Sequence, residues 1–164
     1  MKNLVDDLKE RNINAKLIDA DVLLKVKKWI YNKNLNNAPI DKQIDKLYEE
    51  YNELMTGINN DSYLEVIDAV GDLFIALVTL STQLNINIHY RFDQPFYVHC
   101  DESDIYNQIE LIELMKDEFS IYYLINQLSK YCLNYYDFTL EEAVEFAYDE
   151  IKDRPQTYSN GEWK

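Results

Sequence analysis

Hydrophobic residues recur at helical spacing along most of the chain. In the first well-patterned segment, Val22, Val26 and Trp29 return every three or four residues, which places them on one face of an α-helix. The same periodicity predicts helices over residues 18–33, 40–56, 62–85, 103–117, 119–134 and from 139 to about 152, with a shorter amphipathic stretch at 2–11. Only three Gly and three Pro occur in 164 residues, so the sequence predicts an all-α fold.

Polar residues and helix breakers mark where the predicted helices end. The sequence Gly-Ile-Asn-Asn-Asp at residues 57–61 predicts a helix stop followed by a new N-cap. Thr139, with Glu142 three residues later, predicts a capping box at the start of the last helix. Residues 85–100 alternate in character and predict an extended loop or a short edge hairpin, and residues 155–164 predict a polar tail.

The predicted helix at 62–85 differs from the others in its distribution of apolar residues. They cover most of its circumference rather than one stripe, which is typical of a helix buried at the centre of a domain. A length of 164 residues suits one domain, so we expect residues 1–164 to fold as a single unit around this helix.

Charge and cysteine content narrow the classes of function. A net charge of −14 disfavours binding along DNA or RNA, because the phosphates would be repelled, although excess acid also simply keeps a protein in solution. Cys100 and Cys132 form no CxxC pair and are expected to be reduced thiols of a cytosolic protein. Residues 1–7 do not resemble a signal peptide, and the longest apolar stretch, 66–80, is too short to span a membrane.

Two of the predicted helices carry clusters of acidic residues. Glu49, Glu50 and Glu53 are spaced so that all three lie near one face of the helix at 40–56. Exposed glutamates are common on helices, and a solvated acidic face explains this first cluster equally well.

The second acidic cluster lies within the apolar helix. At roughly 100° per residue, Glu65, Asp68 and Asp72 fall within about 60° of one another around the helix axis. Burying unpaired carboxylates is costly, like charges four residues apart repel, and no basic residue lies in this segment to pair with them. A hard divalent cation such as Mg²⁺ is the natural partner.

Other metals fit this chain less well. Zinc prefers Cys and His ligands at characteristic spacings that the sequence lacks, and a di-iron bundle needs Glu-x-x-His pairs. His89 and His99, the two histidines, have no Glu three residues before them and are expected to be loop residues.

The two acidic clusters form a recognisable order along the chain. It reads Glu49-Glu50-x-x-Glu53, then Glu65-x-x-Asp68, then Asp68-Ala-Val-Gly-Asp72-Leu-Phe. This order resembles the ExxE…ExxD signature of the MazG-like all-α nucleoside triphosphate pyrophosphohydrolases, a group that includes all-α dUTPases and dCTPases. Residues 147–154, with Asn160-Gly161 after them, resemble the end of phage-encoded members. The resemblance covers residues 18–86 and 138–164, whereas 87–137 match nothing in the family.

The chain departs from the family pattern in the second motif and at its C-terminal end. The usual second motif has a Glu where this chain has Ala69. Either Glu65-x-x-Asp68 is the motif and Asp72 an extra ligand, or Asp68 replaces the missing Glu. At the C-terminal end, Asp149 stands where phage members commonly have Asn, and Pro155-Gln156-Thr157 stand where they have more basic residues.

The resemblance implies a fold, a reaction and a set of site residues. The fold is a four-helix-type bundle with an irregular insertion and extra helices, and the reaction is hydrolysis of a nucleoside triphosphate, expected to be a dNTP, to the monophosphate and pyrophosphate. The resemblance implies that Mg²⁺, or Mn²⁺ as an alternative, is bound by Glu50, Glu53, Glu65, Asp68 and Asp72. It implies that Glu49 activates the water and that Lys152 and Arg154 neutralise phosphate oxygens. The residues implied to contact the substrate are Trp29, Lys46 and Asp149, together with Lys152 and Arg154.

Alternatives to this interpretation remain at the level of sequence. Trp29 also suits core packing, and Lys152 and Arg154 also suit a helix C-terminus, where cations interact with the dipole. A catalytically inactive nucleotide- or protein-binding module on the same fold is one rival function, and an acidic mimic of nucleic acid is another. Relatives assemble as dimers or tetramers and the central helix is very apolar, so we expect a homodimer or homotetramer in the cytoplasm, or in the host cytoplasm for a phage protein.

Overall fold

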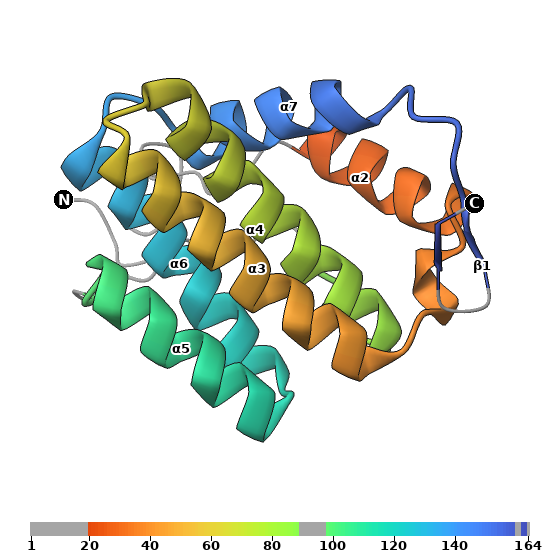
Figure 1. The fold of residues 1–164 in the computed structure, drawn as a ribbon. Coiled ribbons are helices and arrows are strands. Elements are labelled where there is room, and N and C mark those ends of the chain that lie inside the picture. The colour runs from red at the N-terminus through yellow and green to blue at the C-terminus, as the bar shows by residue number, and fades with distance from the viewer. Residues whose placement is uncertain (1–19, 89–97, 160–161, 164) are drawn as a thin grey trace, which may run out of the picture.

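The structure is a computed structural model that describes residues 20–88, 98–159 and 162–163. Within these ranges the chain forms six α-helices, one 3-10 turn and a two-stranded antiparallel ladder (Figure 1). The elements are α2 (Ala20–Asn32), η1 (Leu35–Asn37), α3 (Ile40–Asn59), α4 (Tyr63–Gln83), α5 (Glu102–Met115), α6 (Glu118–Tyr135), α7 (Leu140–Ile151), β1 (Tyr158–Ser159) and β2 (Glu162–Trp163). The predicted all-α fold is confirmed, while the amphipathic stretch at 2–11 and His89 lie outside the described residues.

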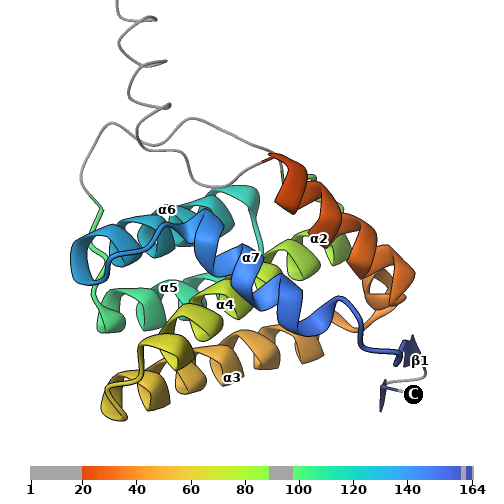
Figure 2. The ribbon, with the colours of Figure 1, turned by 90° about the horizontal axis from the view of Figure 1, so that it is seen from above.

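Helix α4 is the buried centre of the molecule, as its apolar circumference predicted. Fourteen of its 21 residues are buried, and it packs most extensively against α3 and α7. Figure 2 shows α7 lying across α4, between α2 and α6. None of the helices in the described part of the chain is long and apolar enough to cross a membrane.

The crossing of α4 and α7 depends on a glycine. A Cβ atom at Gly71 would lie 2.1 Å from the backbone oxygen of Ala143 and 2.7 Å from the Cβ of Ala147. Only a residue without a side chain fits there, so the two helices approach closely. This contact brings the last turn of α7 beside the middle of α4.

The turn between α3 and α4 corrects one prediction. Helix α3 does not stop at Gly57 but continues to Asn59, and the N-cap of α4 is Ser62, whose Oγ accepts a hydrogen bond from the Glu65 backbone N–H at 3.3 Å. Gly57 serves a close contact instead, because a Cβ there would lie 3.0 Å from the Cβ of Glu65. Asp61 provides the left-handed residue of the turn, with φ of 51°.

The capping box predicted for the last helix is present. Thr139 Oγ1 accepts from the Glu142 N–H at 3.1 Å, and Glu142 Oε1 accepts from the Thr139 N–H at 3.2 Å. Helix α7 then begins at Leu140 and ends at Ile151.

The segment that matched no family pattern supplies a second helix pair. Helices α5 and α6 pack on each other, α5 also contacts α3, and α6 contacts α4. Asp101 and Asp117 cap the two helices with their side chains. The residues before this pair, 86–88, have no regular structure, and 89–97 lie outside the described part.

The C-terminal residues are not the polar tail that the sequence predicted. The Tyr158 N–H donates to the Lys33 carbonyl at 2.9 Å, and Asn34 Nδ2 donates to the Tyr158 carbonyl at 3.2 Å. Tyr158 also pairs with Trp163 across the ladder. These bonds hold the ladder against the C-terminal end of α2 (Figure 1).

Candidate active site

Three carboxylates converge where α3 and α4 lie side by side. One oxygen each from Glu50, Glu53 and Asp72 lies within 4.8 Å of the others. The i, i+3 spacing brings Glu50 and Glu53 to the same face of α3, and the short turn to α4 brings Asp72 opposite them. Glu50 is buried, Asp72 half-buried and Glu53 exposed, so the cluster opens toward solvent on one side.

Glu50 is the most deeply buried member of this cluster. Glu50 is only 4% exposed. The Lys46 ammonium lies 2.9 Å from Glu50 Oε1, but Oε2 is buried and has no hydrogen-bond partner among the described residues. Burial raises the pKa of Glu50 to about 7, against the opposing effect of Lys46. One oxygen of a buried acid is therefore available to a ligand.

The pKa of Asp72 is raised as well. Burial, followed by the charges of Glu50 and Asp68, raises the pKa of Asp72 to about 8. Without a cation, these acids are therefore partly protonated at neutral pH. A bound divalent cation would remove both causes of the shift, because it replaces lost solvation and offsets the mutual repulsion.

Asp68 lies one helical turn before Asp72 and extends the acidic surface toward α7. Its Oδ1 is buried without a hydrogen-bond partner in the described ranges. Burial raises its pKa, and the charges of Glu150 and Glu53 act in the same direction while Arg154 opposes them. Glu150, on the last turn of α7, therefore belongs to the same electrostatic environment.

The carboxylates line a cavity of about 800 Å³. Aromatic, basic and neutral side chains line it as well. The aromatic side chains are Trp29, Tyr158 and Trp163, and the basic ones are Lys33, Lys42, Lys46 and Arg154. Ligand pockets for small molecules are typically about 300–1,000 Å³, so this cavity is large enough for a nucleotide.

The cavity separates the residues predicted from sequence into two groups. Those that line it are Trp29, Lys46, Glu50, Glu53, Asp68, Asp72 and Arg154. Those that do not are Glu49, Glu65, Asp149 and Lys152.

The second group is engaged in local contacts elsewhere. Glu49 is exposed and lies 3.3 Å from Lys46 Nζ, on the outer side of that lysine. Glu65 is in the first turn of α4, where its carboxylate accepts from Asn60 Nδ2 at 3.1 Å. Seven residues separate it from Asp72, which is about 10 Å along a helix. Lys152 and Asp149 form an exposed ion pair with each other at 3.0 Å.

Several cavity residues were not predicted. Glu150 lies three residues after Ala147, which is buried against α4, and this helical spacing was a usable signal. Tyr158 and Trp163 flank the Asn160-Gly161 dipeptide, which is a common hairpin sequence and was interpreted as part of a polar tail. Lys33 and Lys42 carried no distinguishing pattern.

Comparison with known proteins gives one partial relative. The chain is 32% identical over 73 residues to an uncharacterised 18.2 kDa protein from the rep–hol intergenic region of Haemophilus phage HP1. The similarity covers 43% of this chain and 45% of the phage protein, which is less than half of either. No family model and no solved structure matches the chain.

Proposed function

We propose that this protein is a Mg²⁺-dependent nucleoside triphosphate pyrophosphohydrolase that releases the monophosphate and pyrophosphate. The observation that carries the proposal is the convergence of Glu50, Glu53 and Asp72 within 4.8 Å, in a cavity that also holds basic and aromatic side chains. A triphosphate needs cations along its phosphates, and a nucleoside offers a flat ring to aromatic groups.

The donor set suits a hard divalent cation. All the candidate ligands are carboxylate oxygens, and the partnerless oxygens of Glu50 and Asp68 are positions where such an ion is favoured. Glu50, Glu53 and Asp72 would hold Mg²⁺, or Mn²⁺, with Asp68 beside them. When bound, the metal would lower the pKa of a coordinated water and offset the charge of the departing pyrophosphate.

The protein's own basic groups would bind and orient the phosphates. Lys46 is held at the cluster by Glu50, and Arg154 and Lys42 line the same cavity. Asp68 lines the cavity and Glu49 does not, so Asp68 rather than Glu49 would accept a hydrogen bond from the attacking water.

The test is hydrolysis of a panel of dNTPs and NTPs, with Mg²⁺ and then with EDTA, followed by identification of the products. We expect NMP and pyrophosphate only with metal. Glu53→Ala and Asp72→Asn should each lower kcat/KM by roughly 10³-fold, since they remove charge stabilisation at the reacting phosphates. Glu145→Gln, at an exposed position on α7, is the matched control and should retain full activity. Hydrolysis that persists in EDTA or in Glu53→Ala would refute the proposal.

Ala69 favours one second candidate, a nucleotide-binding module without turnover. The family resemblance places a Glu at this position, and Ala69 is 2% exposed with no ligand atom to offer. Tight, metal-dependent nucleotide binding without product would identify this alternative.

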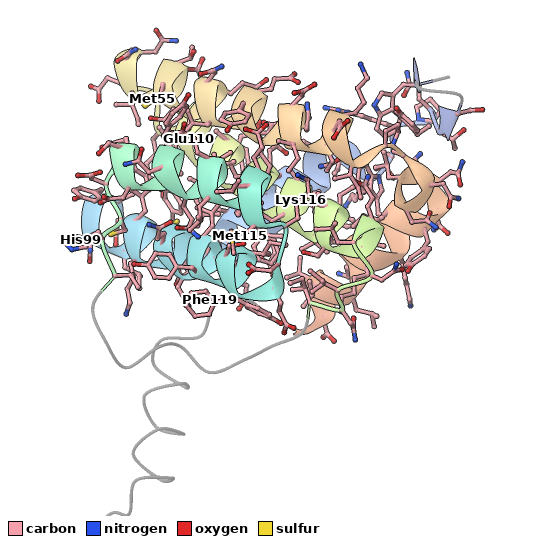
Figure 3. All side chains as sticks on the ribbon, turned by 90° about the horizontal axis from the view of Figure 1, so that it is seen from below. Met55, His99, Glu110, Met115, Lys116 and Phe119 are labelled. Atoms are coloured by element: carbon pink, nitrogen blue, oxygen red, sulfur yellow. The ribbon has the colours of Figure 1, made fainter. Side chains whose placement is uncertain are left out.

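The homodimer or homotetramer also remains a proposal. Large apolar side chains are exposed where α5 ends and α6 begins, with Leu114 77% and Phe119 73% exposed. Figure 3 shows Met115 and Phe119 at this end of the helix pair. Such a cluster is consistent with contact between copies, and the expected location is the cytoplasm, or the host cytoplasm for a phage protein.

A further inference from the structure

Both tryptophans of the chain line the cavity. Trp29 and Trp163 are 134 positions apart in the sequence, yet their ring centroids lie 6.3 Å apart with an interplanar angle of 34°. Trp163 is 47% exposed, so part of its ring surface remains accessible. An accessible aromatic surface beside a second ring is suited to receive a flat ligand ring.

Trp29 carries a polar atom that no group in the described part of the chain satisfies. Its Nε1 is buried and has no hydrogen-bond partner in the part of the chain that the structure describes. An indole N–H is a donor only, and a buried donor left unpaired costs about 1–3 kcal/mol. An acceptor on a ligand in the cavity would relieve this cost.

Trp163 is held in place by main-chain bonds rather than by packing alone. It pairs with Tyr158 across the ladder, and the two rings meet edge to face at 6.0 Å. Tyr158 is in turn bonded to the Lys33 carbonyl at the end of α2. The ladder thus positions Trp163 against the helix that carries Trp29.

We propose that Trp29 and Trp163 form the base-binding subsite, in which Trp163 stacks on the nucleobase and the Trp29 indole N–H donates to a ring nitrogen or carbonyl oxygen of that base. The identity of the ring as a nucleobase rests on the proposed function. Carboxylates and basic residues line the same cavity, which leaves the phosphates to them. The C-terminal ladder is therefore a specificity element of the site.

Tryptophan fluorescence reports directly on this subsite, because the chain has no tryptophan elsewhere. The probes are a dNTP analogue with an imido bridge between the α- and β-phosphates, and inorganic tripolyphosphate, each with Mg²⁺. We expect the analogue to quench the fluorescence and tripolyphosphate to leave it nearly unchanged. Calorimetry should show that Trp163→Leu lowers the affinity for the analogue about tenfold, which is the order expected for loss of base stacking. The affinity for tripolyphosphate should be unchanged.

Two further variants sharpen the result. Trp29→Phe keeps a ring but removes the N–H. It should lower the affinity for the analogue severalfold and leave the affinity for tripolyphosphate unchanged. Tyr31→Leu, an aromatic that is 60% exposed on the same helix and outside the cavity, is the control and should bind both probes normally. Circular dichroism of each variant excludes unfolding as the cause.

The outcomes separate this inference from the proposed function. Analogue affinity, or the KM of hydrolysis, that is unchanged in Trp163→Leu would overturn the subsite and leave the hydrolase proposal intact. Analogue binding that depends on Trp163, in a protein that never releases pyrophosphate, would support the subsite and overturn the hydrolase. Failure of the wild-type protein to bind the analogue would overturn both.

Discussion

Two helix pairs in this molecule bury polar side chains of different kinds. In the α3–α4 pair the buried and half-buried groups include Glu50 and Asp72, which are acids. In the α5–α6 pair the buried polar side chains are neutral, and include Gln108 and Gln127. The pairs are alike in architecture, so the difference reflects what each is required to do.

The buried neutral side chains find most of their hydrogen-bond partners within the chain. Gln108 Nε2 donates to the Ser120 carbonyl at 2.8 Å, and Gln127 Nε2 donates to the His99 carbonyl at 2.8 Å. Asn126 Oδ1 and Gln127 Oε1 lack partners in the described ranges, but an unpaired amide oxygen costs far less than an unpaired charge. In the other pair, Glu50 Oε2 and Asp68 Oδ1 are carboxylate oxygens without a partner in the described ranges, which favours a ligand as the reason for the retention of these acids.

The most disruptive change should be Gly71→Ala, at the crossing of α4 and α7. The new Cβ would meet the Ala143 carbonyl at 2.1 Å, and overpacking of this kind costs about 3 kcal/mol. Displacement of α7 would also move Glu150 and Arg154, so we expect kcat/KM to fall together with the free energy of unfolding measured in urea. Gly57→Ala is the comparison, since its nearest contacts are at 3.0 Å and a smaller loss is expected. Equal effects of the two changes would contradict this account of the crossing.

The charged interior should make stability depend on pH and on divalent cation. Burial raises the pKa of Glu50 to about 7 and of Asp72 to about 8, above the values of about 4 in an unfolded chain. In EDTA the stability contributed by protonation is fully present below about pH 4 and is lost as pH rises through about 8. Mg²⁺ should restore it at pH 8.

The variant that isolates this effect is Asp72→Asn. It removes the buried charge and should raise the melting temperature in EDTA at pH 8 by about 2–4 °C, equivalent to about 1 kcal/mol. It should also abolish most of the stabilisation by Mg²⁺. Glu110→Gln, at an exposed position on α5, should change neither property. A lower melting temperature for Asp72→Asn in EDTA would show that the charge is paired within the protein.

The smallest effect is expected from the neutral pair. Gln108→Leu replaces a buried amide with an apolar group of similar size, and the Ser120 carbonyl lies in the first turn of α6, where it can retain its helical bond. We expect the free energy of unfolding to change by less than about 1 kcal/mol. Its dependence on pH and on Mg²⁺ should match that of the wild type. A changed response to Mg²⁺ would mean that the two pairs are energetically coupled.

Periodicity in the sequence predicted the helices well because it reports directly on which face is buried. The uniform apolar surface of residues 62–85 predicted the central helix, and Thr139 with Glu142 predicted a cap that is present. Gly57 was misinterpreted because a glycine that permits a close approach has the same letter as one that ends a helix. Spacing along the chain does not distinguish these two uses.

The candidate site was predictable where it depends on a single helix. Glu50 and Glu53 share a face by spacing alone, and Asp68 and Asp72 were conspicuous among apolar neighbours. Contributions from distant segments were missed, because nothing local reveals that Trp163 returns to Trp29. The position of Glu65 outside the cavity was likewise not predictable, because it depends on how far along α4 the acids of α3 lie.

The position of α5 and α6 has a consequence for how this protein can diversify. No residue of either helix lines the cavity, and the pair contacts the rest of the molecule through α3, α4 and α7. Substitutions on their exposed surfaces can therefore accumulate, or be introduced by design, without altering the geometry at the carboxylates. In a lineage of such proteins, this pair would be the part where new assemblies or new binding partners arise first, while the α3–α4 face stays under the constraint of its chemistry.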